Sequence, residues 1–512
     1  MALETETQFR SMRIFSLLVL CYFTQLQAQN TFSVVHHNLN MLAGSGRSIF
    51  EVDDGYLLFS VQWAWDSTTG AVFVTKFDLD GNYVFEKQHK RTRNLDPGLI
   101  DPIALNMDGS YTAAITCFEG GEAPDSIFLY TFDQDGDTTR SVFLDAAPSQ
   151  GMRDCLLTPD GSFLISGICT IAVDPLADCA CIRKVSASGE ELWRKTWPAL
   201  RSISNALPTS DGGYLLGTTD SFYPDLASIL KVDSLGNQQW IRNFGGNALN
   251  GVSSLLEMED GSFLVPSAFA SLDSSQNAED QYSSLYHYSS SGSLLWRHDI
   301  QYGRLSTAAQ IMHSADGGYW LTGGYYQIPR DPDLATTIWK LDAAADTLFS
   351  RKYWYYGGYG AVNAATYGIN TTSDGGLIMT GLAKQGINGE QPLLGSCWIL
   401  KLDQFGCLTP GCQSVGVQEY EMALQNALQL SPNPSSTLVH VELPLPEGYR
   451  LAGDVQALVL DAQGKEVLRN TIGNTGLGLN GSLDVSGLPS GMYFLHLRDA
   501  EKWLAGGKVI VE

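Results

Sequence analysis

One short motif, Asp-Gly-x-aromatic followed by an apolar run, recurs along most of the chain and constrains its fold more than any other feature. Its copies begin at Asp108, Asp160, Asp211, Asp260 and Asp316, with a variant ending in leucine at Asp374 and a degenerate Asp-Asp-Gly-Tyr at Asp53. Seven copies with a period of about 50 residues are typical of β-propellers and solenoids.

Each copy reads as four short strands joined by tight turns. The Asp-Gly pair indicates a hairpin, because aspartate accepts hydrogen bonds from the turn backbone and glycine adopts the positive φ that the turn requires. A second turn, Asp-x-x-Gly, follows the next apolar run, and an aromatic residue stands four positions after its glycine. That aromatic is Phe85, Trp193, Trp240, Trp296 or Phe349, whereas Arg140 breaks the pattern in the second copy and Ala345 replaces the glycine before Phe349. Seven copies of four strands predict an all-β fold, a seven-bladed β-propeller over residues 29–412.

The last copy lacks a fourth strand, because Cys407-Leu-Thr-Pro-Gly-Cys412 interrupts it. Residues 31–37 form an apolar segment in which Val34 precedes Asp53 by 19 residues, close to the 20 that separate Trp240 from Asp260. We therefore expect the N-terminal strand to complete the last blade and close the ring, which removes two exposed sheet edges. An open solenoid is the alternative.

The charge of the chain excludes one large class of partner. The 512 residues include 31 Lys and Arg against 55 Asp and Glu, a formal net charge of -24. Sequence-independent binding to nucleic acid or to anionic membranes depends on clustered Lys and Arg, so both are disfavoured. Because one or two turn aspartates per repeat supply much of this charge, it says little about a cationic partner.

The N-terminus has the pattern of a secretory signal peptide. Arg10 and Arg13 precede an apolar run, Ile14 to Phe23, which is too short to span a bilayer, and Ala28 offers a cleavage site. We expect residues 1–28 to be removed; Met12 is an alternative start. A lipoprotein anchor at Cys21 is disfavoured by the bulky Leu20. No other segment has the length of a transmembrane span.

Eight cysteines remain after residue 28, an even number that favours disulfides in an exported chain. Cys407 and Cys412 bracket a turn and are the pair that we expect first. Cys155, Cys169, Cys179 and Cys181 are expected to pair among themselves, with the connectivity open. A zinc site is the competing interpretation, but Cys-x-Cys at 179 and 181 lacks a second suitably spaced pair.

After a polar linker at residues 413–429, the repeat stops and a different pattern begins. Residues 430–512 contain short alternating segments separated by turns, which predict a small immunoglobulin-like β-sandwich. They include a Pro-Asn-Pro opening, an Asp-x-x-Gly hairpin, a Gly-x-Tyr segment and a lysine-led last strand. These residues are Pro432, Asn433, Pro434, Asp461, Gly464, Gly491, Tyr493 and Lys508.

These motifs resemble the C-terminal sorting domain of the Bacteroidetes type IX (Por) secretion system. The resemblance implies that the domain is a secretion address read by the outer-membrane translocon, and that it is commonly cleaved as cargo is released or attached to surface lipopolysaccharide. Residues 31–412 resemble the propeller cargo of such proteins. The resemblance therefore implies a secreted or cell-surface location and says nothing about activity.

The residue pattern offers little catalytic chemistry. None of the eight histidines forms a metal-binding pattern with a second histidine or cysteine, and no nucleophile elbow or phosphate loop is present. Asp78, Asp80, Asp133, Asp135 and Asp137 resemble fragments of calcium loops, but they fall on predicted hairpin turns without the glutamate that completes an EF-hand, so turn chemistry is favoured. We expect no cofactor, no metal and no catalytic residue.

The variable loops carry exposed aromatic residues beside carboxylates, a combination that suits sugar stacking or a protein hot spot. In a propeller, the B–C and D–A loops share one face. The aromatic residues of this predicted ligand-binding face are Trp63, Trp65, Tyr223, Tyr325, Tyr326, Tyr355, Tyr356 and Tyr359. The carboxylates beside them are Asp225, Asp280, Asp331 and Asp333. The alternative is that the rings only anchor loops between blades.

The sequence favours a monomeric, exported recognition or adhesion propeller that binds a glycan or protein ligand, with the C-terminal domain as the type IX sorting signal. The alternatives are a secreted hydrolase or lyase acting on polysaccharide or protein at the mouth of the channel, and a purely structural role in a surface layer.

Overall fold

Apolar runs on either side of the Asp-Gly turns pair as antiparallel strands throughout residues 32–406. The structure is a computed structural model, in which the described residues are 30–38, 40–64, 70–89, 95–96, 103–117, 125–147, 151–171, 177–220, 227–244, 248–272, 278–303, 306–326, 334–353, 355–356, 361–385, 394–414, 419–420, 424, 427–445, 451–475, 478–500 and 502–512. The predicted signal peptide lies outside them.

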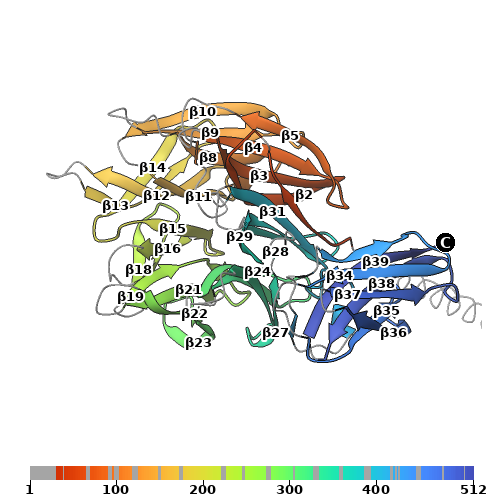
Figure 1. The fold of residues 1–512 in the computed structure, drawn as a ribbon. Coiled ribbons are helices and arrows are strands. Elements are labelled where there is room, and N and C mark those ends of the chain that lie inside the picture. Colours follow the sequence, from red (N-terminus) through yellow and green to blue (C-terminus); the bar gives the residue numbers. More distant parts are fainter. Residues whose placement is uncertain are drawn as a thin grey trace, which may run out of the picture. The chain divides into compact units, whose positions relative to one another are not determined.

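The strands form the seven blades predicted from the repeat (Figure 1). Blade 1 consists of β2 (Ala43–Val52), β3 (Gly55–Trp63), β4 (Gly70–Phe77) and β5 (Tyr83–His89). Blade 2 consists of β6 (Leu95–Asp96), β7 (Ile103–Leu105), β8 (Tyr111–Cys117), β9 (Asp125–Phe132) and β10 (Thr138–Ala147). Blade 3 consists of β11 (Gly151–Leu157), β12 (Phe163–Ile171), β13 (Ala177–Val185) and β14 (Glu191–Trp197). Blade 4 consists of β15 (Ile203–Pro208), β16 (Tyr214–Asp220), β17 (Ala227–Val232) and β18 (Gln238–Phe244).

The remaining blades follow the same order. Blade 5 consists of β19 (Ala248–Val252), β20 (Leu256–Glu257), β21 (Phe263–Leu272), β22 (Ala278–Tyr288) and β23 (Leu294–Gly303), and β19 also pairs with β16 of blade 4. Blade 6 consists of β24 (Ser306–His313), β25 (Tyr319–Tyr326), β26 (Leu334–Leu341) and β27 (Thr347–Tyr353). Blade 7 consists of β29 (Ala361–Thr371), extended by β28 (Tyr355–Tyr356), then β30 (Leu377–Gln385), β31 (Leu394–Leu402) and the N-terminal strand β1 (Phe32–His36).

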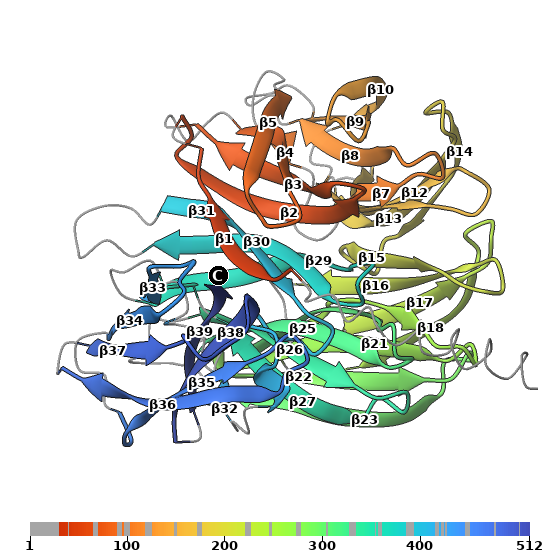
Figure 2. The ribbon, with the colours of Figure 1, turned by 90° about the vertical axis from the view of Figure 1, so that its right-hand side faces the viewer.

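The N-terminal strand closes the ring, as predicted. β1 pairs antiparallel with β31, and β2 of blade 1 contacts β29, β30 and β31 of blade 7. Figure 2 shows β1, in red, beside β31, in cyan. This closure rules out the open solenoid.

Polar contacts fasten the closing strand to blade 1. The carboxylate of Glu86 accepts hydrogen bonds from Asn38 (2.5 Å) and Gln62 (3.1 Å) and lies 2.8 Å from Nε2 of His36. Burial opposes the ionisation of Glu86, but the hydrogen bond from His36, with those from Gln62 and Thr75, outweighs burial and lowers the pKa of the carboxyl. The N-terminal strand is thus held by an ionised, largely buried glutamate as well as by its backbone.

On the outer strands that carry an aromatic residue at this place, that residue packs between blades, as predicted. A Cβ atom added to Gly236 of blade 4 would lie 2.9 Å from the ring of Trp193 in blade 3, so the two blades meet closely at this turn. Across the closure, a Cβ atom added to Gly81 would lie 2.6 Å from the ring of Phe32. Phe32, rather than Val34, therefore holds the aromatic place of blade 7, because it lies opposite Lys401 in the register.

A buried lysine on the third strand stabilises most of the Asp-Gly turns. The lysines of blades 3, 4, 6 and 7 pair with the turn aspartates at 2.6 to 2.9 Å, in the pairs Lys184–Asp160, Lys231–Asp211, Lys340–Asp316 and Lys401–Asp374. Lys76 pairs with Asp54 in blade 1. Burial raises the pKa of Asp211, but hydrogen bonds from Lys231 and Thr209 outweigh it and lower the pKa to about 2. The turn aspartate therefore neutralises a buried cation in addition to forming the turn.

The C-terminal residues form a separate unit. Residues 407–414 group with residues 428–512, whereas Phe32–Gly406 form the other unit. The C-terminal unit contains β33 (Gln429–Ser431), β34 (Leu438–Pro444), β35 (Val455–Leu460), β36 (Glu466–Asn474), β37 (Gly478–Asp484), β38 (Gly491–Asp499) and β39 (Lys502–Val511). A 3-10 turn spans Cys412–Ser414 in this unit, whereas the short strand β32 (Glu419–Tyr420) groups with the propeller unit. β36 pairs with both β35 and β37, which joins the two layers of the predicted β-sandwich.

The sorting motifs hold this sandwich together. Asn433 bonds the backbone of β39 twice, donating to the carbonyl of Lys508 (2.7 Å) and accepting from the amide of Ile510 (2.8 Å). Asp461 accepts the backbone amides of its turn, in which Gly464 has φ 78°, and the hydroxyl of Tyr493 donates to the carbonyl of Pro489 at 2.7 Å. Side chains of the motif thus replace β-ladder hydrogen bonds at the strand ends.

Candidate functional site

The backbone places several of the predicted ligand-binding residues at one end of the blades. Trp63 ends β3, Tyr325 and Tyr326 end β25, and Tyr355 and Tyr356 form β28. All five lie at the strand ends opposite the Asp-Gly turns, since Trp63 is registered with Gly70, Tyr326 with Leu334 and Tyr355 with Val362. Closure by β1 makes their blades, 6, 7 and 1, consecutive in the ring.

Of the remaining residues of the predicted face, only one lies among the described residues. Asp280 lies within β22. The others, Trp65, Tyr223, Tyr359, Asp225, Asp331 and Asp333, lie outside the described residues.

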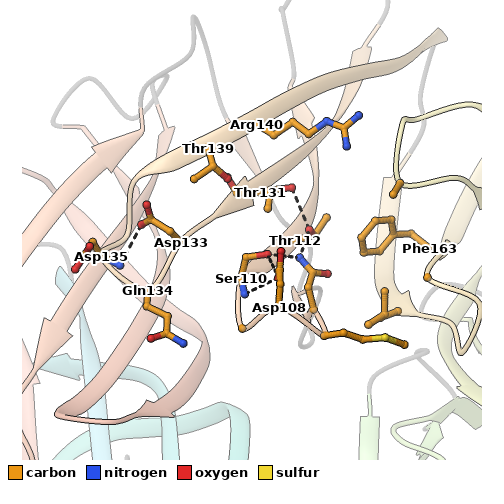
Figure 3. Close-up of a pocket in the computed structure, with 16 residues that line it drawn as sticks. Asp108, Ser110, Thr112, Thr131, Asp133, Gln134, Asp135, Thr139, Arg140 and Phe163 are labelled. Carbon is orange, nitrogen blue, oxygen red and sulfur yellow. Dashed lines mark hydrogen bonds between the residues drawn. The ribbon is translucent and has the colours of Figure 1, made fainter.

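At the opposite end of the strands, the Asp-Gly turns of blades 2 and 3 border a cavity of about 870 Å³ (Figure 3). Blade 2 contributes its two turns, with Asp108 and Asp133, and residues of β8, β9 and β10. Blade 3 contributes an apolar side that includes Leu157 and Phe163. Sequence reasoning missed this cavity, although it singled out Arg140, which lines it.

The cavity arises where blade 2 departs from the other blades. In six of the seven blades, an aromatic residue on the outer strand lies opposite a lysine or histidine on the third strand. Blade 2 has other residues at both positions. The pairs are Phe85–Lys76, Trp193–Lys184, Trp240–Lys231, Trp296–His287, Phe349–Lys340 and Phe32–Lys401, against Arg140–Thr131 in blade 2. Threonine is too short to fill the volume of a lysine chain, so the space beside the Asp-Gly turn stays open.

A chain of hydrogen bonds fixes the polar floor of the cavity. The Asn106 amide donates to the hydroxyls of Ser110 (2.9 Å) and Thr112 (2.8 Å), and Thr112 lies 3.1 Å from the hydroxyl of Thr131. Hydrogen bonds from the side chain and backbone of Ser110 lower the pKa of Asp108, which is therefore an anion at neutral pH. Oδ1 of Asn106 is buried without a hydrogen-bond partner, an arrangement that structural stability alone does not favour.

Arg140 reaches over the cavity from the outer strand. It is exposed, and its guanidinium extends from β10 toward the side that carries Phe163 (Figure 3). In blade 2, Val142 of β10 packs against the turn of blade 3 at Gly189, where the other blades use their aromatic residue. Arg140 is thereby released from packing between the blades.

The two segments that resemble calcium loops are hairpin turns stabilised by their own aspartates. Asp78 Oδ1 accepts the amides of Asp80 and Asn82 at 2.9 and 2.8 Å, and Asp133 Oδ1 accepts those of Asp135 and Asp137 at 3.0 and 2.8 Å. Over the described ranges, no group of three or more His, Cys, Asp or Glu side chains could hold a metal ion.

The disulfides follow the sequence analysis in part. Cys407 pairs with Cys412 as predicted, and Cys169 pairs with Cys181. Cys179 lies opposite Cys169 in the ladder and packs against the disulfide. The expectation that all four cysteines of this repeat pair is wrong for Cys155, a buried thiol in the core between blades 2 and 3.

Residues 429–512 match the protein family described as the secretion system C-terminal sorting domain. This match confirms the resemblance to type IX sorting domains, so the chain is addressed to the type IX machinery for secretion or attachment to the cell surface. In the part of the chain that the structure describes, no helix has the length and apolar character needed to cross a membrane. No sequence among curated proteins matches the chain.

Several solved structures are similar in fold. A protein of unknown function from Bacteroides caccae is 15% identical, with a TM-score of 0.34, over 55% of this chain and 89% of the other. The β-propeller domain of the Trilobed protease from Pyrococcus furiosus is 10% identical, with a TM-score of 0.40, over 70% and 94%. The polysaccharide lyase Uly1 is 10% identical, with a TM-score of 0.45, over 72% and 91%. At these levels of similarity, none of them informs the activity.

Proposed function

We propose that this chain is an exported recognition or adhesion module, in which the propeller binds a glycan or protein ligand and the sorting domain delivers it to the type IX translocon. The proposed organisation is a signal peptide at residues 1–28, a propeller at 29–412, a linker at 413–429 and the sorting domain at 430–512. The mature protein acts as a monomer outside the cell or on its surface.

One observation carries this proposal. Trp63, the Tyr325–Tyr326 pair and the Tyr355–Tyr356 pair lie at the same strand ends of three consecutive blades, and blades 7 and 1 are neighbours because the ring is closed. Residues far apart in the sequence thereby share one region of one face. Neighbouring aromatic side chains suit the stacking of sugar rings and the anchoring of protein ligands.

The test is binding of the full chain to arrays of glycans and of extracellular proteins. The double variants Tyr325→Ala/Tyr326→Ala and Tyr355→Ala/Tyr356→Ala are expected to lower the affinity for the ligand found by about tenfold or more, as for a hot spot. Phe143→Ala is the matched control, since Phe143 is an exposed aromatic residue on the outer strand of blade 2.

Undiminished binding by both folded double variants would show that the ligand lies elsewhere. Release of soluble fragments from an arrayed polysaccharide or protein would support the alternative, a hydrolase or lyase. Among the described residues, we find no observation that favours that alternative.

A further inference from the structure

We propose that the cavity between blades 2 and 3 is a second ligand site, which binds a neutral saccharide. It lies at the Asp-Gly turn ends of the blades, whereas the aromatic face lies at the opposite strand ends, so the two sites are separate. This inference does not depend on the proposed function of the aromatic face.

The cavity is built by two coupled replacements. Thr131 and Arg140 face each other across β9 and β10, and both line the cavity. The replacement of lysine opens a space beside Asp108, and the replacement of the aromatic residue directs a hydrogen-bond donor to its rim. In blade 3, which has the same Asp-Gly-Ser turn, Lys184 fills the equivalent space and bonds Asp160 at 2.6 Å. The turn itself is thus compatible with a lysine, and blade 2 lacks it.

The lining suits a ligand rich in hydroxyl groups. The hydroxyls of Ser110 and Thr139 donate to Oδ1 of Asp108 and to the carbonyl of Thr131, so their oxygens can still accept a hydrogen bond, as can Oδ2 of Asp108. One proton of the Thr112–Thr131 hydroxyl pair remains to donate, and the guanidinium of Arg140 only donates. A saccharide hydroxyl both donates and accepts, so it can satisfy each of these groups. Leu157 and the exposed Met107 supply apolar surface for the CH face of a sugar ring.

The charge of the lining selects a neutral ligand. Three carboxylates, those of Asp108, Asp133 and Asp135, line the cavity, whereas its only cationic lining residue is Arg140. An anionic sugar or a phosphate would face net repulsion from this set. Oδ1 of Asp133 accepts two backbone amides of its turn, and Oδ1 of Asp108 accepts the amide and the hydroxyl of Ser110. The Oδ2 atoms of both residues and the carboxylate of Asp135 therefore remain as the acidic acceptors for a ligand. The volume, about 870 Å³, falls in the range of natural small-ligand pockets.

The test is calorimetric titration of the full chain with three sets of oligosaccharides. The neutral set contains gluco-, manno-, xylo- and galacto-oligosaccharides, the acidic set oligogalacturonates, and the cationic set chitosan oligosaccharides. Thr131→Lys refills the cavity with the side chain that the other blades carry. Arg140→Gln removes the cation and leaves the cavity open. Gln239→Lys is the matched control, because it adds the same charge at an exposed position of β18 in blade 4.

We expect a neutral oligosaccharide to bind, Thr131→Lys to weaken its binding by at least tenfold, Arg140→Gln to weaken it severalfold, and Gln239→Lys to leave it unchanged. Thermal melts verify that each variant is folded. Three results would overturn the proposal: no binding by any neutral oligosaccharide, unchanged binding by folded Thr131→Lys, or tighter binding of the acidic or cationic set. Variants of Tyr325 and Tyr326 distinguish this site from the aromatic face, since they must not change binding here.

Discussion

Thr131 lies directly opposite Arg140 in the ladder between β9 and β10, at the register position where the other six blades set a lysine or histidine opposite an aromatic residue. Blade 2 therefore moves its cation from the interior strand to the exposed outer strand. The Asp-Gly turn loses its buried partner and gains a cavity. The other six blades use both residues of this pair for packing. Blade 2 differs from them at both positions.

The buried lysines predict an asymmetric response to mutation. The side chain of Lys231 is 3% exposed and that of its partner Asp211 is 53% exposed. We expect Asp211→Asn to cost about 3 kcal/mol, because it leaves a buried ammonium group without a counter-charge, and Lys231→Met to cost about 1 kcal/mol, because the aspartate left behind is solvated. Urea denaturation measures both. Equal costs, or the reverse order, would argue against a role of the aspartate in neutralising the lysine.

The closure of the ring depends on Glu86. Asn38 donates to Oε1 of Glu86 and Gln62 donates to Oε2, so in Glu86→Gln the new NH2 group must face one of these two donors. We therefore expect a loss of about 2 kcal/mol in the free energy of unfolding. Glu190→Gln, at an exposed turn of blade 3, is the control and is expected to change stability by less than about 0.5 kcal/mol. If the two variants are equally stable, the polar network does not hold the closing strand.

The sorting domain is expected to lose stability in mild acid through His496. Trp503 Nε1 donates to Nδ1 of His496 at 3.0 Å, and Nε2 of His496 bonds the carbonyl of Pro410 at 3.1 Å. Burial lowers the pKa of His496 to about 4. The unfolded chain binds a proton below about pH 6.5, so stability is full above that pH and decreases by about 3 kcal/mol as the pH falls to about 4.

Hydrogen-exchange mass spectrometry of peptides from β38 and β39 between pH 7 and pH 4 measures this loss. His496→Asn should lower protection at pH 7 and remove most of the pH dependence. The exposed His440→Asn is the control and should keep the wild-type profile. A wild-type profile in His496→Asn would assign the acid sensitivity to other groups.

The cysteine pairing predicts a definite peptide map. Under non-reducing conditions, we expect cross-linked peptides that join Cys169 to Cys181 and Cys407 to Cys412. Cys155 should react with an alkylating reagent only after unfolding, because it is 1% exposed and burial raises its pKa. Cys169→Ser should cost about 3 kcal/mol. A cross-link that contains Cys155 would contradict this pairing.

The sequence predicted the parts of the fold that depend on local chemistry. Asp-Gly turns, apolar runs and the missing fourth strand after Asp403 fixed the blades and their closure, because hairpin turns and the need to cover sheet edges act over short distances. The alignment of β1 was less certain, since Phe32 and Val34 point to the same side of a strand and only the pairing with Lys401 distinguishes them.

The site was less predictable, because it depends on volumes and partners that no motif records. Arg140 was visible in the sequence as a break in the pattern. The cavity beside it could not be inferred until the structure showed that Thr131 lies opposite Arg140. A lysine two residues before the Asp-x-x-Gly turn was also visible in most copies of the repeat. Comparing this position across the seven copies would have shown that the second copy has Thr131 there. The aromatic face stays a prediction: the register puts Trp63, Tyr325 and Tyr355 at the same strand ends, and only the closure of the ring makes their blades consecutive.

We propose that blade 2 departs from the repeat for binding and not for stability. The double variant Thr131→Lys/Arg140→Thr tests it most directly, because it returns the cation to the interior strand without changing the net charge. We predict that its free energy of unfolding rises by about 1 kcal/mol, as the new lysine fills the cavity and pairs with Asp108, while binding of neutral oligosaccharides is lost. A double variant that is less stable than the wild type, or that still binds, would contradict the claim.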